Sequence, residues 1–554
     1  MAFIVDNLAP IMFCNLIGFL LLGFPVAFSL AATGVVYGLV AVEFNLMSPL
    51  LFQALPQRIF GIVSNDSLLA VPFFTFMGLI LERSGMAEDL LDTVGRLFGS
   101  LRGGLAIAVV FVGALLAATT GVVSASVISM GLISLPIMLR YGYDRRLAAG
   151  VIAASGTLSQ IIPPSLVLIV LADQLGRSIG DMYRGAMLPG LLLAGAYMAY
   201  VFLVAFFRPG QAPALPPEAR GEVDARGRRG LRSLLVLTVI AAAAAHFGSD
   251  YYFRSHTDIP MDERVVIVLL IWGVAALAMA LGNRVLRLGW LSKLAEQVVF
   301  VMIPPLALIF LVLGTIFIGV ATPTEGGAMG AMGALIMAVS RGRFSLTQLR
   351  QAMESTARLT CFVIFILVGS TIFSLSFRGI NGDLWVEQLL LHIPGGETGF
   401  LVVVSLMTFF LAFFLDFFEL AFIIVPLLGP VADKMGIDLI WFGVLLAVNM
   451  QTSFVHPPFG FALFYLRSVA PKEDYRDRVT GRLIAKVTTA QIYWGSIPFI
   501  IIQILMVAAV LAFPGMVTHY KSDAPTINPS SVTFGQESAY GLDSYDGEDD
   551  GGFQ

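Results

Sequence analysis

The sequence is poor in charge for its length. Of its 554 residues, 13% are charged and 57% are hydrophobic, and the mean hydropathy is +0.86. Soluble globular domains carry nearer ~25% charged residues. This composition excludes a soluble protein and predicts a polytopic, multi-pass membrane protein. The net charge of -4 indicates little, because much of the acidity lies in the last residues of the chain.

Cysteine and histidine are also scarce. Cys14 and Cys361 both lie in apolar runs, so the sequence predicts neither a disulfide framework nor a thiolate metal site. The five histidines are scattered, without the H-x-x-x-H spacing of a zinc site. No G-x-x-x-x-G-K-[ST] loop and no His/Asp/Cys constellation is present. We therefore expect no enzyme activity, organic cofactor, ATPase partner or nucleic-acid partner, and keep a polytopic membrane enzyme as a remote alternative.

Two apolar stretches are broken by polar residues and a proline pair. One is Gly142 to Pro164, GYDRRLAAGVIAASGTLSQIIPP, and the other is Gly436 to Gly460, GIDLIWFGVLLAVNMQTSFVHPPFG. A shift of 294 residues without gaps superposes Asp144 on Asp438 and both proline pairs. Proline removes a backbone donor, so each pair leaves polar backbone groups that lipid cannot satisfy. Paired interrupted helices in two halves predict the midplane site of a secondary transporter.

Each predicted break follows a stretch that we interpret as a re-entrant hairpin. Thr119 to Pro136 is too short and too rich in Gly, Ser and Thr for an ordinary lipid-facing helix, and Leu415 to Pro430 is its counterpart. The alternative for the first stretch is a helix-packing face of small residues. Together these features predict an all-α polytopic fold made of inverted repeats, with two re-entrant hairpins and two broken helices.

Composition and loops divide the chain into eight parts. They are scaffold spans and surface helices at 1–103, a first transport-domain half at 104–175, a scaffold span at 176–207, a basic loop with an inserted helix pair at 208–290, scaffold spans with a surface helix at 291–399, a second transport-domain half at 400–468, a basic loop with the last span at 469–513, and a disordered acidic tail at 514–554.

Three points of topology stay open. The apolar run Ile11 to Val42 fits one kinked span or two short ones. The positive-inside rule places the arginine-rich 208–232 and 467–486 inside and the acidic tail outside. Residues 341–358 are also basic, but counting spans places them outside, which suggests that the count is wrong by one span.

The residues at the breaks predict an ion site. Hydroxyl and amide oxygens suit sodium, and half-helix ends carry partial charges of both signs. The candidate sodium ligands are Ser124, Ser126, Ser155, Thr157, Asn449, Thr452 and Ser453. For each hydroxyl alone, a bond to its own helix carbonyl one turn back is the more frequent arrangement.

A second set of residues is assigned to the solute or to gating. It contains Gly121, Ser159, Gln160, Pro163, Pro164, Asp416, Gln451, Pro457 and Pro458. Asp416 is a functional candidate because a carboxylate in apolar surroundings is costly, but it would equally serve as a helix cap. Glu325, in the motif ATPTEGG, is expected to cap a helix with Thr322 or Thr324. His456 is expected to be structural rather than a proton relay.

Three segments resemble those of a known family. They are RYGYDRRLAAGVIAASGTLSQIIPPS, ATPTEGGAMGA, and FFLDFFELAFIIVPLLGPVADKMGIDLIWFGVLLAVNMQTSFVHPPFGFALFYLRSVAP, which ends at Pro471. The chain resembles the large membrane (DctM-like) subunit of tripartite ATP-independent periplasmic transporters over nearly its whole length. Two features depart from the common pattern: the inserted pair at 234–281, and Ser126 where many members carry an acid.

The resemblance implies an elevator-type transporter with sodium bound at the two broken-helix loops. It also implies two partners, a small four-helix membrane subunit and a periplasmic solute-binding protein. We therefore expect the permease subunit of a sodium-coupled importer of an organic acid, for example a 2-oxo acid, or of a polyol-like solute. The alternative is a self-sufficient cation-coupled carboxylate carrier of similar fold.

Overall fold

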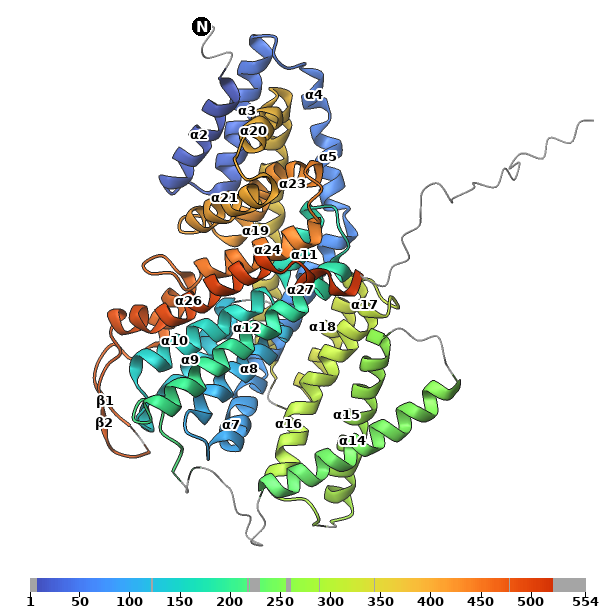
Figure 1. The fold of residues 1–554 in the computed structure, drawn as a ribbon, viewed down its shortest axis with the longest axis vertical. Coiled ribbons are helices and arrows are strands. Elements are labelled where there is room, and N and C mark those ends of the chain that lie inside the picture. The colour runs from blue at the N-terminus through green and yellow to red at the C-terminus, as the bar shows by residue number, and fades with distance from the viewer. Residues whose placement is uncertain are drawn as a thin grey trace, which may run out of the picture.

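A computed structural model describes residues 7–120, 123–216, 219, 230–255, 261–287, 289–342, 344–477 and 479–521. The described chain is almost entirely helical (Figure 1). The strands within it are β1 (Tyr475–Arg476) and β2 (Leu483–Ile484), which form one antiparallel ladder. The all-α polytopic fold predicted from the sequence is confirmed.

The first half of the chain contains two helices before a surface segment, then a pair of helices, a broken helix and a long helix. Its elements are α2 (Leu8–Leu21), α3 (Val26–Glu43), α4 (Leu50–Gln53), α5 (Leu55–Val63), η1 (Asp66–Leu69), α6 (Ala70–Arg83), α7 (Met86–Phe98), α8 (Gly104–Thr120), α9 (Val123–Arg140), α10 (Arg145–Thr157), η2 (Leu158–Gln160), α11 (Leu166–Gln174) and α12 (Ile179–Phe207).

The inserted pair and the second half follow in the same order. Their elements are α14 (Gly230–Ser255), α15 (Met261–Val285), α16 (Lys293–Ile309), η3 (Phe310–Gly314), α17 (Thr315–Phe317), α18 (Pro323–Ser340), α19 (Leu346–Gly379), α20 (Gly382–Leu391), α21 (Gly396–Leu411), α22 (Phe417–Ile423), α23 (Val425–Lys434), α24 (Leu439–Ser453), α25 (Phe461–Val469), α26 (Thr489–Ala512), α27 (Gly515–Thr518) and η4 (His519–Lys521).

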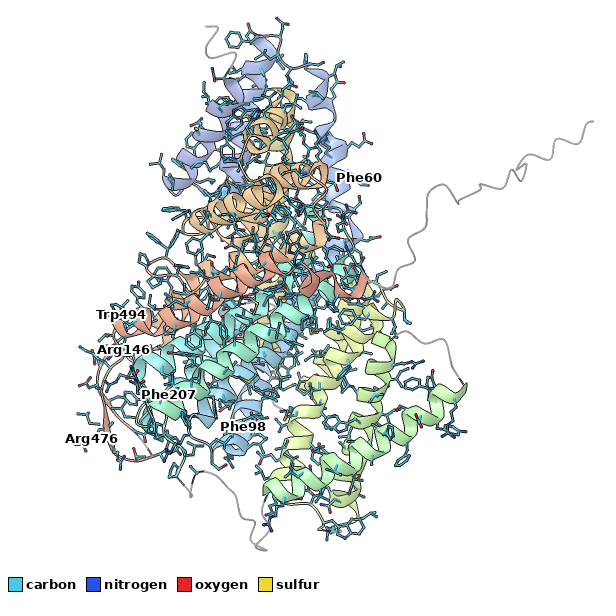
Figure 2. The ribbon with its side chains drawn as sticks, in the orientation of Figure 1. Phe60, Phe98, Arg146, Phe207, Arg476 and Trp494 are labelled. Atoms are coloured by element: carbon cyan, nitrogen blue, oxygen red, sulfur yellow. The ribbon has the colours of Figure 1, made fainter. Side chains whose placement is uncertain are left out.

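Within the described residues, eight helices are long and apolar enough to cross a membrane, or up to ten if each of two bent pairs is one span. Figure 1 shows α10, α12 and α26 side by side, with α2, α3 and α20 at one end of the view and α14 to α16 at the other. Aromatic and basic side chains gather at one edge, where Figure 2 shows Phe207 and Trp494 near Arg146 and Arg476. Such mixtures are typical of a membrane interface.

The 294-residue repeat extends from the sequence to the helix boundaries. Shifting α9 by 294 residues gives 417–434, which is the range covered by α22 and α23 together. Asp144 and Asp438 are equivalent N-caps, because each carboxylate accepts the backbone N–H groups two and three residues further on. The same signal therefore starts the broken helix in both halves.

The two halves run in opposite directions. The Asp144 N–H donates to Gln211 O, beyond the C-terminal end of α12. Asp438 instead pairs with Lys521 at 2.5 Å, and the neighbouring Tyr520 hydroxyl donates to the carbonyl of Asp181 at the N-terminal end of α12. A helix of 29 residues is about 40 Å long, so the equivalent caps lie beside opposite ends of α12. The predicted inversion of the halves follows from this placement.

Several boundaries differ from those expected. The run at 11–42 forms two helices, since Leu22 to Pro25 separate α2 from α3. The surface helix and span expected around 344–377 form one helix of 34 residues, α19. Its first turns lie near α7, because Arg341 pairs with Asp89 and Arg83 donates to Gln351. Arg96 of α7 lines a cavity together with Arg140 and Leu215, and Arg140 pairs with Asp477. Residues 341–358 therefore lie at the same end of the helices as the described parts of the basic loops, 208–216 and 467–477.

The predicted hairpins have other arms than those expected. In the first half, α8 ends at Thr120 and the continuous 18-residue α9 begins at Val123, so Thr119 to Pro136 does not contain two half-helices; residues 121–122 lie outside the described residues. In the second half, Ala412 to Asp416 join α21 to α22. The sequence did not show where α8 ends, because no charged residue separates the apolar residues 104–118 from Thr119 and Thr120. That the pairs re-enter the membrane stays a prediction.

Packing also groups α12 with the broken helices, as it contacts α8, α11, α24 and α26. The assignment of 176–207 to the scaffold stays a prediction. Residues 515–521 of the predicted tail form helical turns, in which Val517 is buried, and 522–554 lie outside the described residues. At the ATPTEGG motif, Thr322 and Glu325 form the expected capping box.

Glycine pairs allow the closest helix crossings. A Cβ at Gly150 of α10 would lie 2.0 Å from the carbonyl oxygen of Gly495 in α26, and a Cβ at Gly495 would lie 2.1 Å from Arg146 O. In the other group of helices, a Cβ at Gly369 of α19 would lie 2.5 Å from Ala27 O in α3. Small residues let membrane helices approach in this way. The first crossing joins α10 to α26, and the second joins α19 to α3.

The inserted pair packs on the second half through its own small core. Leu237, Ala241, Ala276 and Ala280 pack on Val299 and Ile303 of α16. Asn283 Oδ1 accepts the backbone N–H groups of Trp290 and Leu291, and Ser233 Oγ accepts the N–H of Ser292 at 2.9 Å. The last bond places the start of α14 beside the start of α16.

An ion pair anchors the β1–β2 loop to the end of α9. Arg140 Nε lies 3.0 and 3.1 Å from the two carboxylate oxygens of Asp477, whose side chain is 5% exposed. Burial opposes ionisation of Asp477, but hydrogen bonds from Thr480 and Arg140 and the arginine charge outweigh it. They hold the pKa of this carboxyl below its ordinary value.

We expect Gly495→Val to destabilise the protein strongly, because the new side chain meets the α10 backbone. Overpacked sites typically cost about 1–3 kcal/mol. The thermal midpoint of the purified protein in detergent measures the effect. Gly195→Val is the matched control in α12, where a Cβ meets nothing within 4 Å. Equal midpoints for the two variants would contradict the crossing.

We expect Asp477→Asn to lower the thermal midpoint at pH 7 by a few degrees. Because the folded pKa is depressed, the stabilisation is complete above the unfolded pKa of about 3.9 and is lost as the pH falls through the folded value. The difference between wild type and variant should therefore shrink in acid. Asp433→Asn is the control, since the Arg177–Asp433 pair is exposed and should contribute little. A difference that does not change with pH would contradict this.

Candidate functional site: a cavity between two helix breaks

Both predicted helix breaks are present, and they meet. In the first half, Ile161 to Ser165 separate η2 from α11, and in the second half, Phe454 to Gly460 separate α24 from α25. Gln451 Nε2 donates to Thr157 Oγ1 at 3.3 Å. These two residues are 294 positions apart, so they are the same residue of each repeat. A contact between equivalent positions places both breaks at the pseudo-two-fold axis that relates the halves.

Local bonds satisfy part of the interrupted backbone. Ser165 Oγ donates to Gln160 O at 2.5 Å, and the Gly460 N–H donates to His456 O at 2.7 Å. Gly460 is required there, since a Cβ would lie 2.6 Å from Phe454 O. His456 Nδ1 lies 3.0 Å from Thr452 O, and its ring packs edge-on against Phe409, in line with the structural role expected for it.

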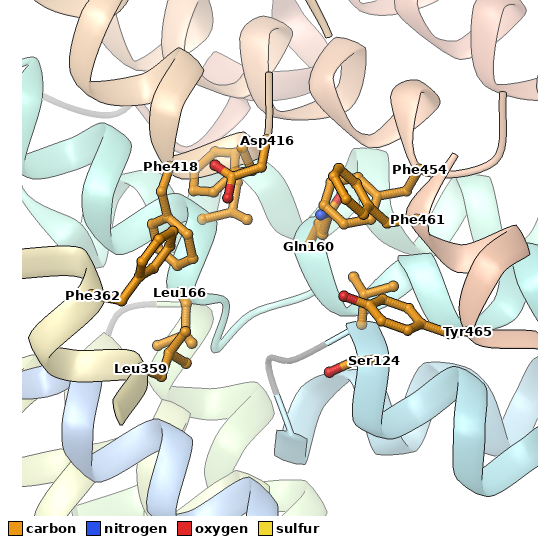
Figure 3. Close-up of a pocket in the computed structure, with 13 residues that line it drawn as sticks. Ser124, Gln160, Leu166, Leu359, Phe362, Asp416, Phe418, Phe454, Phe461 and Tyr465 are labelled. Atoms are coloured by element: carbon orange, nitrogen blue, oxygen red, sulfur yellow. The ribbon is translucent and has the colours of Figure 1, made fainter. Parts of the chain in front are cut away.

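A cavity of about 250 Å³ lies where the breaks face the two helix pairs (Figure 3). Eight of its lining residues form four pairs that are 294 positions apart: Val123 and Phe417, Ser124 and Phe418, Gln160 and Phe454, and Val167 and Phe461. The cavity therefore also lies at the axis, with one wall from each half. Leu166, Leu359, Phe362, Asp416 and Tyr465 complete the lining.

The polar groups of the lining are few. Figure 3 shows Asp416 on one side and Ser124 and Tyr465 on the other, with Gln160 between. Gln160 is 3% exposed, and its Oε1 has no hydrogen-bond partner. None of the described residues that line the cavity is Lys, Arg or His. A buried oxygen without a donor and an uncompensated carboxylate both favour a bound cation or a hydrogen-bonding solute.

Asp416 combines the two roles that the sequence left open. Its carboxylate caps α22 by accepting the Glu419 N–H at 2.9 Å, while Glu419 accepts the Asp416 N–H at 2.8 Å. Asp416 also lines the cavity, whereas Glu419 lines a neighbouring one beside the α2–α3 turn. The capping box fixes the orientation of the Asp416 side chain at the N-terminus of α22.

The predicted sodium ligands fall into two groups, one at each break. Ser155 is fully buried on α10, and its Oγ has no partner. Thr157, Thr452 and Ser453 donate to carbonyls three residues earlier in their own helices, and the Asn449 amide donates to Ser405 O. Ser126 is buried on α9, and Ser124 lines the cavity. The local bonds are those anticipated for single hydroxyls, and sodium binding stays a prediction.

Of the predicted solute or gating residues, Gln160 and Asp416 line the cavity and Gln451 joins the breaks. Ser159 donates to Gly156 O, while Pro163, Pro164, Pro457 and Pro458 lie in the breaks and do not line the cavity. Gly121 lies outside the described residues.

The phenylalanines of the lining were missed, as was Tyr465. Their signal was the repeat itself, because a shift of 294 from Gln160 leads to Phe454. Also missed was a second buried contact beside the breaks, in which Gln503 Nε2 of α26 donates to the hydroxyl of Tyr197 in α12 at 2.8 Å.

Comparison with known proteins identifies the family. Residues 13–516 match the family described as "Tripartite ATP-independent periplasmic transporter, DctM component". The chain belongs to this family of large TRAP permeases. It is therefore a multi-pass transport protein of the inner membrane that serves organic solutes, and it is not an enzyme. Transporters of this family in general combine the large permease with a small membrane subunit and a periplasmic binding protein.

Relatives of this permease are named for different solutes. The C4-dicarboxylate TRAP transporter large permease protein DctM of Pseudomonas aeruginosa is 28% identical, over 86% of this chain and 92% of its own. The ectoine/5-hydroxyectoine large permease UehC of Ruegeria pomeroyi is 24% identical, over 92% and 97%. Among solved structures, the YdaH transporter of Alcanivorax borkumensis covers 84% of this chain and 88% of its own, with 14% identity and a TM-score of 0.48.

Proposed function

We propose that this permease is the translocating subunit of a sodium-coupled, binding-protein-dependent importer of an organic acid, for example a 2-oxo acid, or of a polyol-like solute. The observation that carries the proposal is the cavity between the two helix breaks, at the axis of the inverted halves. Inverted-repeat transporters commonly place their solute and ion sites near the bilayer midplane, where the two repeats meet.

The charge of the cavity supports coupling to a cation. Asp416 lies in a lining that holds no basic residue among those described. An anionic solute would add a second negative charge in a poorly solvated place, which is strongly unfavourable without compensation. Sodium supplies that compensation, and the unpartnered oxygens of Ser155, Gln160 and Gln451 are ligands of the kind that it takes.

Proteoliposomes that contain the permease and its small membrane subunit test the proposal. We expect uptake of a labelled 2-oxo acid to need an inward sodium gradient and the binding protein, and to fall by about tenfold or more when potassium replaces sodium. Uptake that is unchanged in potassium would overturn the coupling. Full uptake without a binding protein would favour the self-sufficient carrier.

A single hydroxyl at the second break tests the position of the ion. We expect Thr452→Val to raise the sodium concentration at half-maximal uptake by about tenfold, the effect of losing one ligand worth ~1.4 kcal/mol. Thr315→Val is the matched control, since Thr315 also donates to carbonyls of its own helix, but away from the breaks. Equal sodium dependence of both variants and wild type would exclude Thr452 as a ligand.

A further inference from the structure

The two walls of the cavity differ in chemistry although the repeat makes them equivalent in position. The second half contributes Phe417, Phe418, Phe454 and Phe461. The equivalent residues of the first half are Val123, Ser124, Gln160 and Val167. Because related positions lie at related places around the axis, the backbone does not require an aromatic ring at any of them. The aromatic wall is therefore a property of this sequence, and the solute is the molecule that would contact it.

The rings form two groups across the cavity. Phe362 and Phe418 contact each other edge to face, with centroids 6.4 Å apart. Phe454 and Phe461 contact each other with centroids 5.8 Å apart. Figure 3 shows the first pair on one side of the cavity and the second pair on the other. A flat apolar group between them would find ring faces and edges on both sides, the arrangement that aromatic pairs prefer.

The polar groups suit only one end of a solute. Ser124, Gln160 and Tyr465 can bond one carboxylate or 2-oxo group, with the coupling cation offsetting Asp416. A second carboxylate, or the hydroxyls of a polyol, would lie against phenyl rings. These groups would lose their hydrogen bonds to water without gaining new ones from the protein, which is energetically costly. The volume of about 250 Å³ lies just below the range of about 300–1,000 Å³ that ligand sites commonly have, so the cavity suits a small solute.

We infer that this permease selects a small monocarboxylate with a planar apolar body, such as an aryl-substituted 2-oxo acid, over dicarboxylates and polyols. The inference rests on the proposed function and narrows its solute class. The aromatic wall is the part of the permease that makes the choice. Apolar burial against the rings supplies the affinity, and the single polar end supplies the orientation.

Two ligands with the same 2-oxo acid end test this directly. Phenylpyruvate carries a ring where 2-oxoglutarate carries a second carboxylate. The binding of each acid is measured in sodium buffer, with the full-length permease and its small subunit in nanodiscs. The binding protein is left out, so its selectivity does not contribute. We expect phenylpyruvate to bind about tenfold tighter. Equal or tighter sodium-dependent binding of 2-oxoglutarate would overturn the inference and leave the sodium-coupled importer intact. Failure of both acids to bind in sodium would also overturn the inference, and it would leave the proposed importer intact because that importer receives its solute from the binding protein.

Replacing a phenylalanine of the second half by the residue at the equivalent position of the first half distinguishes binding at the aromatic wall from non-specific binding. Phe461→Val and Phe454→Gln install the first-half residues, and each should remove most of the preference for phenylpyruvate. Phe464→Val is the matched control, because Phe464 lies on the same helix, α25, is 49% exposed and does not line the cavity. Size-exclusion profiles and thermal midpoints confirm folding, and Phe461→Tyr, which keeps the ring, should retain the preference. A preference unchanged in Phe461→Val and Phe454→Gln would overturn the role of the wall.

Discussion

An interrupted helix within an apolar layer leaves peptide groups that lipid cannot bond, and this constraint organises the protein. Both interruptions are placed against each other at the centre, where Gln451 reaches Thr157. Other helices pack around them: α8 and α9 contact η2, α21 and α23 contact α24, and α12 and α26 each contact the broken helices of both halves. The unpartnered Gln160 Oε1 belongs to a residue that lines the cavity, where a polar solute can bond to it.

The two helix interruptions can be recognised in the sequence. Asp-x₁₈-Pro-Pro at a separation of 294 residues marks where each broken helix begins and where it stops, and the structure has both N-caps and both breaks at those residues. Such signals are local, since a cap bonds its own first turn and a proline lacks its own N–H. They survive in any tertiary context, so the halves, their order and their inversion were predictable.

Features that depend on distant neighbours were not predictable in the same way. The apolar residues of α8 read equally well as a separate span or as a hairpin arm, because hydrophobicity reports burial and not the partner. The length of α19 was missed since its charged first turns resemble a surface helix. The phenylalanines of the cavity resemble any other apolar residues of a membrane helix until the repeat places each opposite its equivalent. Their grouping is a property of the folded chain.

The inserted pair shows how a transporter can gain helices without disturbing its inverted plan. The bond between Ser233 and Ser292 means that the chain, after passing through α14 and α15, returns to the end where the pair began. An even number of added crossings therefore leaves the second half facing the way it would face without them. A single added helix would turn that half over and destroy the antiparallel relation on which the central cavity depends. Insertions at this junction are thus restricted to pairs.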